Sequence, residues 1–164
     1  MVSIWRRGAA VLPIVVAFAT AAAVPMPAAH ADNRRLNGTL VTNVYMVQRQ
    51  AGCITEVRIN PQLQLAAQWH ANDVMRNRSL SGDLGSDGST PQSRAQAAGY
   101  RGNAAQTIAI NPSLAINNLE ILERWYYDPV SYGIMSDCAN AEIGVWSENS
   151  LDRSVVVAVY GQPG

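Results

Sequence analysis

The stretch that decides the fold is Ser154-Val155-Val156-Val157-Ala158-Val159-Tyr160, close to the end of the 164-residue chain. Successive side chains of a β-strand point to opposite faces of its sheet, so this run is apolar on both faces. We therefore predict a central strand that helices cover on each side. The apolar run Ile143–Trp146 and the turn-forming residues 148–152 come before it and predict a β-hairpin.

Two helices are predicted near the start of the region that contains this hairpin. Between Leu36 and Gln50 apolar residues recur at helical spacing, and Gly52 is a residue typical of a helix end. Asn60-Pro61 has the residue types of an N-cap and a first helical residue. The helix that this pair opens is predicted to run to Asn77.

The middle of the chain predicts a loop, a short helix and a strand. Residues 79–89 are rich in Gly, Ser and Asp, a composition typical of loops. Thr90-Pro91 opens a short helix, which Gly99 ends. The apolar run Ala104–Ile110 is short enough to favour a strand over a helix.

A last helix is predicted to begin at Asn111-Pro112 and to end before Pro129. Its expected core face consists of Ala115, Leu119, Leu122 and Tyr126. Residues 129–141 are predicted to be irregular. The complete order of elements indicates an α/β (α+β) domain, in which helices cover both faces of a small, mostly antiparallel sheet.

The first residues have the pattern of a secretory signal peptide. Arg6-Arg7 is followed by an apolar run, Ala9–Val24, and Ala29-His30-Ala31 matches a small-x-small cleavage site. The run is shorter than the roughly 20 residues needed to cross a bilayer. We expect residues 1–31 to be removed and residues 32–164 to form one secreted domain without a membrane span. A retained membrane anchor is the alternative.

The composition after Ala31 restricts the partners and the compartment. Ten arginines, no lysine and twelve acidic residues give this part a net charge of about −2, which argues against a nucleic-acid partner. Both cysteines, Cys53 and Cys138, lie here. In an oxidising compartment two cysteines of a small domain are expected to form a disulfide. A catalytic thiolate is the alternative.

Several segments occur in an order that is typical of one family. They are Leu65–Met75 (LAAQWHANDVM), Gly85–Pro91 (GSDGSTP) with Arg94 and Ala97–Tyr100, Trp125 with Pro129, and Glu142–Val145 with Val157–Gly161. Together they resemble the CAP superfamily, which comprises the cysteine-rich secretory proteins, insect antigen five and plant pathogenesis-related proteins. The resemblance extends from Leu36 to Gly161 and implies a three-layer α-β-α sandwich.

The resemblance also assigns a cleft. In that family the cleft usually holds two histidines and two acidic residues that can bind a divalent ion. The corresponding positions here are Asp83, Gln106, Asp128 and Ser131, with Tyr132 as the alternative to the last. None of them is a histidine, whereas protein zinc is normally held by His, Cys and some carboxylate ligands. We therefore expect no metal and no cofactor; weak calcium binding through oxygen ligands is the alternative.

His70 is the only histidine after Ala31, so a Ser-His-Asp arrangement would have to use it. The Gly85–Ser89 segment misses the G-x-S-x-G spacing of a nucleophile elbow. His70 lies on the apolar face of its predicted helix, which favours a hydrogen-bonded core residue. A functional role is the alternative.

Three functional hypotheses follow. The first is a secreted, monomeric, non-catalytic CAP-like domain that binds a ligand in the altered cleft or on its surface. The resemblance implies an apolar ligand, such as a lipid or sterol, or a cell-surface or host component, including a protein partner. The second is a divergent hydrolase that uses Asp83 and Asp128 as an acid/base pair. The third is a structural or assembly partner in the cell envelope.

Overall fold

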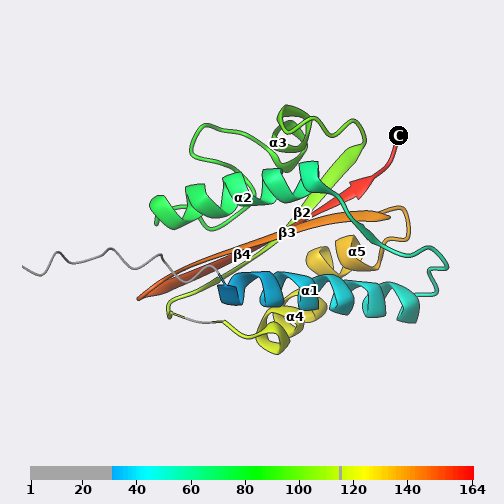
Figure 1. Ribbon diagram of the computed structural model, residues 1–164, viewed down its shortest axis with the longest axis horizontal. Coiled ribbons are helices and arrows are strands. Elements are labelled where there is room, and N and C mark those ends of the chain that lie inside the picture. Colours follow the sequence, from blue (N-terminus) through cyan, green and yellow to red (C-terminus); the bar gives the residue numbers. More distant parts are fainter. Residues whose placement is uncertain (1–30, 115) are drawn as a thin grey trace, which may run out of the picture.

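The structure is a computed structural model that describes residues 31–114 and 116–164 (Figure 1). Residues 1–30, which contain nearly all of the predicted signal peptide, lie outside the described residues. The described elements are α1 (Ala31–Gln50), β1 (Arg58–Ile59), α2 (Pro61–Arg76), α3 (Pro91–Ala97), β2 (Asn103–Asn111), α4 (Asn118–Tyr127), α5 (Pro129–Ser136), β3 (Glu142–Ser150) and β4 (Arg153–Gln162). None of these helices is both long and apolar enough to cross a membrane.

The predicted central strand is confirmed as β4. The sheet has the order β1-β3-β4-β2, and β4 is antiparallel to both of its neighbours. The short β1 is parallel to β3 and was not predicted from the sequence. The hairpin is also confirmed, with β3 and β4 each extending further than the apolar runs that predicted them.

β4 supplies side chains to two separate hydrophobic cores. Val155, Val157 and Val159 pack in the core that α2 and α3 cover. Residues 156, 158 and 160 pack in the core beneath α1, α4 and α5. Figure 1 shows these two helical layers on opposite faces of the sheet. The three-layer α-β-α sandwich implied by the resemblance is therefore present.

Two of the three predicted helix starts are confirmed. The Asn60 side chain accepts hydrogen bonds from the backbone N–H groups of Gln62 (2.9 Å) and Leu63 (3.3 Å) at the start of α2. Thr90 and Ser93 form a capping box at the start of α3. Each cap satisfies N–H groups that the first turn of a helix leaves without partners.

The third predicted start, at Asn111-Pro112, is wrong. Asn111 is the last residue of β2, where it pairs with Ser154 of β4, so the strand continues one residue further than its apolar pattern. α4 begins at Asn118 instead. Its N-cap is Asn117, whose side-chain oxygen accepts from the backbone N–H of Glu120 at 2.9 Å.

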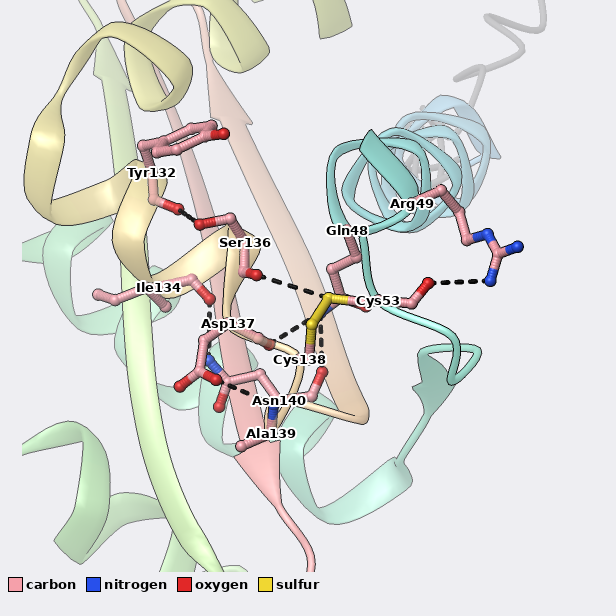
Figure 2. Close-up of a disulfide and its surroundings, with 10 residues drawn as sticks. All are labelled: Gln48, Arg49, Cys53, Tyr132, Ile134, Ser136, Asp137, Cys138, Ala139 and Asn140. Carbon is pink, nitrogen blue, oxygen red and sulfur yellow. Dashed lines mark hydrogen bonds between the residues drawn. A yellow bond between two sulfur atoms is a disulfide. The ribbon is translucent and has the colours of Figure 1, made fainter. Parts of the chain in front are cut away.

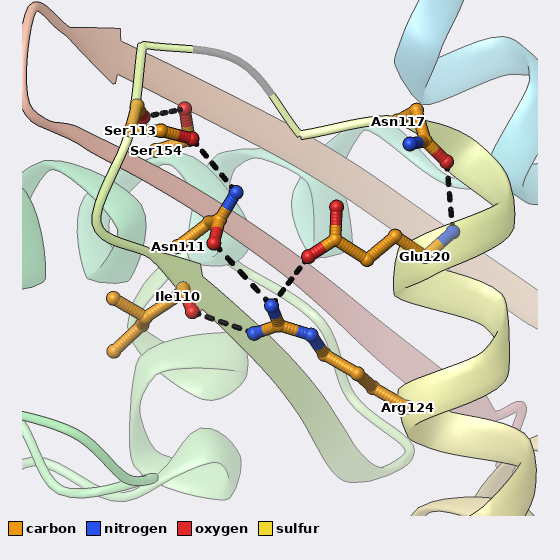
Figure 3. Close-up of polar contacts among 7 residues, drawn as sticks. All are labelled: Ile110, Asn111, Ser113, Asn117, Glu120, Arg124 and Ser154. Atoms are coloured by element: carbon orange, nitrogen blue, oxygen red, sulfur yellow. Dashed lines mark hydrogen bonds and ion pairs between the residues drawn. The ribbon is translucent and has the colours of Figure 1, made fainter.

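Polar contacts hold the end of β2 against α4 (Figure 3). The Arg124 guanidinium donates to the carbonyl of Ile110 at 2.8 Å and to the side-chain oxygen of Asn111 at 3.3 Å. It also forms an ion pair with Glu120, one turn earlier in the helix. Asn111 therefore contributes its backbone to the sheet and its side chain to α4, and does not cap a helix.

The predicted core face of this helix is largely wrong. Leu119 is 64% exposed and Tyr126 is 41% exposed, whereas Ile121 and Trp125 are buried. Ala115 lies outside the described residues. The prediction assumed a helix that starts at residue 112, and the later start places a different set of side chains against the sheet.

The prediction of irregular structure over residues 129–141 is also wrong in its first half, because α5 occupies Pro129–Ser136. Asp128 is both the C-cap of α4 and the N-cap of α5. Asp128-Pro129 has the same N-cap and first-residue chemistry as Asn60-Pro61. In the sequence, Pro129 was interpreted only as the end of the preceding helix.

A disulfide between Cys53 and Cys138 joins the end of α1 to the segment before β3, which confirms the predicted pairing (Figure 2). The backbone N–H of Cys53 bonds to the carbonyl of Gln48 at 2.9 Å, and Gly52 between them has a φ of +91°. This αL helix end turns the chain toward Cys138. The Gln48 side chain donates to the carbonyl of Asn140 at 2.9 Å and supports the same junction.

Replacing both cysteines, as Cys53→Ala/Cys138→Ala, is expected to lower the free energy of unfolding by about 4.5 kcal/mol. The bridge closes a long loop, with a sequence separation of 85 residues, and such loops retain more entropy in an unlinked unfolded chain. Urea denaturation of the disulfide-bonded protein and of the double variant measures the loss. A loss below about 1 kcal/mol would contradict this account of the bridge.

Candidate functional site

Two of the four family cleft positions, Asp83 and Gln106, lie together beside α3. Gln106 is on β2 and is 3% exposed. It pairs with Val159, whose side chain faces α2, so Gln106 points to the same layer. Its side-chain N–H donates to Asp83 Oδ1 at 3.1 Å. These two residues form the floor and one rim of the candidate site.

The Arg94 guanidinium lies directly against this pair. Nη2 donates to Gln106 Oε1 at 2.9 Å and to the Asp83 carbonyl at 2.8 Å. Nη1 donates to the carbonyl of Ser89 at 2.7 Å and to its hydroxyl at 3.2 Å. Arg94 is 5% exposed, and its burial is the main cause of a lowered pKa. Asp83, Asp87 and Asp73 oppose that shift.

Arg94 is therefore held by oxygen dipoles. The ion pairs within residues 31–114 and 116–164 are Arg78–Asp152 and Arg124–Glu120, so no carboxylate in this part of the chain contacts the Arg94 guanidinium. A buried cation requires such hydrogen-bond acceptors to offset the loss of water. The amide at position 106 and the loop carbonyls supply them.

His70 lies beneath the glycine-rich loop of residues 79–89, which supplies these carbonyls, and is completely buried. Its Nε2 is 2.9 Å from the Gly82 carbonyl, which requires Nε2 to carry the hydrogen, while Nδ1 has no partner among the described residues. Burial lowers the pKa of His70, and the Arg94 cation lowers it further, against weaker opposing effects of Asp73 and Asp83. The surroundings of His70 thus favour its neutral form, and its ring contacts the loop backbone.

Asp73 of α2 holds the glycine-rich loop in place, a role that sequence analysis did not assign. Its carboxylate accepts from the backbone N–H and the hydroxyl of Ser86, both at 2.7 Å, and from the Asn77 side chain at 2.6 Å. Burial raises the pKa of Asp73, but these hydrogen bonds outweigh it and leave the pKa lowered. A Cβ at Gly85 would lie 2.5 Å from the Ser89 hydroxyl, so a larger residue there would displace this side chain.

The other two cleft positions, Asp128 and Ser131, lie at the start of α5, in the opposite helical layer. Asp128 Oδ2 accepts from the Ser131 backbone N–H at 2.8 Å and caps the helix. Hydrogen bonding by Ser131 lowers the pKa of the Asp128 carboxyl. Within the described residues no hydrogen bond links this pair to Asp83 or Gln106. The structure therefore brings the four positions together as two separate pairs.

These residues do not fit a zinc ion. No three His, Cys, Asp or Glu side chains gather at one place in the described parts of the chain. At the Asp83–Gln106 pair, a guanidinium already occupies the space next to the oxygen donors. Zinc sites in proteins take three or four N, S or carboxylate ligands from the chain. The donor set here contains one carboxylate and no available imidazole.

Two pockets in the described part of the structure bear on function. The smaller, of about 250 Å³, is lined mostly by polar residues and lies over this cluster. It is lined by Trp69, His70, Asp73, Ser86, Asp87, Ser89 and Arg94. The larger, of about 510 Å³, is a mostly apolar groove between α1, α2 and the free edge of β3. We call it the β3-edge groove, and it is lined by Asn33, Arg34, Asn37, Gly38, Val41, Ile59, Gln64, Val145 and Trp146.

The sequence profile of the cysteine-rich secretory protein (CAP) family matches residues 28–160. The chain belongs to this family. The family resemblance seen in the sequence motifs is therefore confirmed. Comparison with curated proteins gives no match.

Solved structures similar to this CAP domain come from several bacteria. An outer surface protein of Borrelia burgdorferi has a TM-score of 0.66 at 15% identity, over 77% of this chain and 92% of that one. An extracellular protein with an SCP domain from Bacillus anthracis has a TM-score of 0.67 at 11% identity, over 79% and 41%. A cysteine-rich secretory protein of Staphylococcus aureus has a TM-score of 0.56 at 14% identity, over 79% and 40%.

These likenesses establish the fold. This chain spans about two fifths of the length of the B. anthracis and S. aureus proteins. Because identities are so low, the contacts of Asp83, Gln106 and Arg94 in this chain, and not those of its relatives, must define what the cleft can do.

Acidification is expected to destabilise the domain through His70. The pKa of His70 is lower in the folded state than the unperturbed value of about 6.5, so the unfolded chain takes up the proton first as the pH falls. The contribution of His70 to the free energy of unfolding is fully present above about pH 6.5. It is lost as the pH falls toward the folded-state pKa, by at most about 1.4 kcal/mol per pH unit. Urea denaturation of the wild type and His70→Gln between about pH 5 and about pH 7.5 measures this slope.

The difference between the two proteins isolates the histidine, because both keep the same carboxyl groups. His70→Gln is expected to show a shallower loss of stability on acidification. Equal slopes for the two proteins would contradict the assignment of a buried neutral imidazole.

Replacing Arg94 is expected to be costly. Arg94→Met leaves Gln106 Oε1 and two loop carbonyls without their donor, and we expect a loss of about 3 kcal/mol in the free energy of unfolding. The matched change Arg124→Met removes an exposed arginine with similar contacts and is expected to cost about 1 kcal/mol or less. Equal losses in urea denaturation would contradict the structural role of Arg94.

Proposed function

We propose that this protein is a secreted, non-catalytic CAP domain that recognises its ligand at the β3-edge groove. In this proposal residues 1–31 are the signal peptide and residues 32–164 act outside the cytoplasm as a monomer, free or near the cell wall. The altered cleft beside Arg94 is a structural element that holds the glycine-rich loop. The observation that carries the proposal is the use of that cleft by a buried guanidinium.

The contacts of the two candidate acids support a non-catalytic domain. An acid/base pair must reach one substrate from both sides of the reacting bond. Asp83 is bonded to Gln106, whereas Asp128 caps α5 in the other helical layer. His70, the remaining candidate base, is buried with Nε2 directed at a loop carbonyl.

The size and lining of the β3-edge groove support recognition there. Ligand sites are typically concave, of about 300–1,000 Å³, with apolar walls and a few polar groups. The groove has a volume of about 510 Å³ and combines Val41, Ile59 and Trp146 with the side-chain amides of Asn33 and Gln64. The polar pocket over Arg94 is about half as large and falls below this range.

Gly38 allows the groove to be filled without disturbing the core. A Cβ at this α1 position meets nothing within 4 Å, and Gly133 of α5 is equally open but lies away from the groove. With 1-anilinonaphthalene-8-sulfonate as an apolar probe, we expect Gly38→Leu to reduce binding to the exported protein about tenfold, whereas Gly133→Leu leaves it unchanged. Equal binding by the wild type and both variants would refute the groove as a recognition site.

A turnover screen with peptide, ester and glycan substrates separates binding from hydrolysis. We expect no product above the level of Asp83→Asn and Asp128→Asn, which keep the fold. Turnover by the wild type that both variants lose would establish the hydrolase alternative. An organic extract of protein purified from its native medium tests the assembly alternative. That alternative predicts that the extract contains no bound apolar species.

A further inference from the structure

Among the described residues, only the beginning of β3 has a neighbouring strand on the side of the groove. β1 pairs only with Glu142 and Ile143, at the beginning of β3. Within the described residues no strand lies beside β3 from Gly144 onward on this side. The chain leaves the edge at Asn60, where α2 begins. An open edge of this kind can accept an additional strand from another chain.

The strand register shows which backbone groups face the groove. The carbonyl of Ile143 accepts from the backbone N–H of Asn60 at 2.9 Å, so Ile143 points its polar groups away from β4. In an antiparallel pair this direction recurs at every second residue. Val145 and Ser147 therefore also point their N–H and C=O groups toward the open edge.

The outward-facing carbonyl groups two residues before and two residues after Val145 already have hydrogen-bond partners. The Ser147 carbonyl accepts from the Asn33 side chain of α1 at 3.0 Å, and the Ile143 carbonyl has its partner in Asn60. No described residue pairs with the N–H or the C=O of Val145. Val145 is 3% exposed and lines the groove. Unpaired backbone groups in such a place are uncommon, because leaving them unbonded is costly.

The walls of the groove suit an extended peptide. Val41, Ile59 and Trp146 provide apolar contacts, and the Trp146 indole N–H is fixed by a 2.8 Å bond to Glu148. Arg34 is exposed and supplies the one charged side chain among the described residues that line the groove. The groove therefore offers a donor and an acceptor of backbone type, an apolar pocket and one cation.

We propose that the β3-edge groove binds an extended, acidic peptide segment of a partner protein, which adds as a short strand to β3. This inference rests on the proposed function, since it names the ligand of the same groove. The peptide C=O and N–H bond to Val145, an apolar side chain lies between Val41 and Trp146, and a carboxylate approaches Arg34. Strand addition of this type obtains affinity from backbone bonds and specificity from alternate side chains.

An acyl chain fits the groove less well, because it can bond to neither polar group of Val145.

The edge is also held rigidly. A Cβ at Gly144 would lie 2.0 Å from the backbone nitrogen of Gln64, so α2 packs directly on the strand. A rigid edge has little ordering entropy to lose when a peptide binds.

The test uses the exported protein and a phage-displayed hexapeptide library, followed by synthetic copies of the selected peptides. We expect the selected sequences to alternate apolar and polar residues and to include an acidic residue. Gly38→Leu is expected to weaken a selected peptide at least tenfold, and Gly133→Leu is the matched control. Arg34→Gln is expected to weaken it about fivefold, while Arg35→Gln, the neighbouring arginine outside the groove lining, has no effect.

The decisive comparison is between a selected peptide and copies that are N-methylated at one amide each. One N-methylated copy is expected to lose binding at least tenfold, because it cannot donate to the Val145 carbonyl. No effect of methylation at any position, or no effect of Gly38→Leu, would overturn the inference. If the apolar dye or laurate binds the groove and no peptide is selected, the peptide inference fails and the groove remains a ligand site. If nothing binds there, both proposals fail.

Discussion

The domain depends on one strand that is buried on both faces. Ser154 and all residues from Val155 to Tyr160 are fully excluded from solvent in β4, and their side chains enter the two cores alternately. Each fully buried valine contributes about 1.5–3 kcal/mol, so neither helical layer can be removed without exposing a large apolar surface. Backbone pairing with β4 also fixes the positions of β2 and β3 in the sheet. It thereby positions Gln106 on one side of the molecule and the open edge of β3 on the other.

Much of this arrangement could be predicted because its signals are local. The run of apolar residues on both faces predicted β4. Asn60-Pro61 and Thr90-Pro91 predicted the starts of α2 and α3. The errors arose where a similar signal served another purpose. Asn111-Pro112 resembles a helix start, but pairing with β4 continues through Asn111. β1 is only two residues long and exists because it lies beside β3, which no local pattern of Arg58 and Ile59 indicates.

The candidate site was predictable in composition and not in geometry. The sequence placed Asp83 and Gln106 at family cleft positions without histidine, and the structure joins them by a hydrogen bond. It could not show that Arg94 fills the space next to them, because that contact depends on how α3 and the glycine-rich loop pack. The groove at Val145 was equally hidden, since an unpaired edge is defined by the strand that is missing beside it. Under the proposed function, recognition takes place at this sheet edge and not in the cleft.

The central claim is that a buried guanidinium, and not a metal ion, organises the cleft of this CAP domain. Calorimetric titration of the purified protein with Zn²⁺ tests it most directly, with Asp83→Asn as the comparison. Structural zinc bound by three or four ligands from the chain gives strong, saturable binding. The account predicts no saturable heat for either protein. One zinc ion per chain at micromolar affinity or tighter, lost in Asp83→Asn, would contradict it.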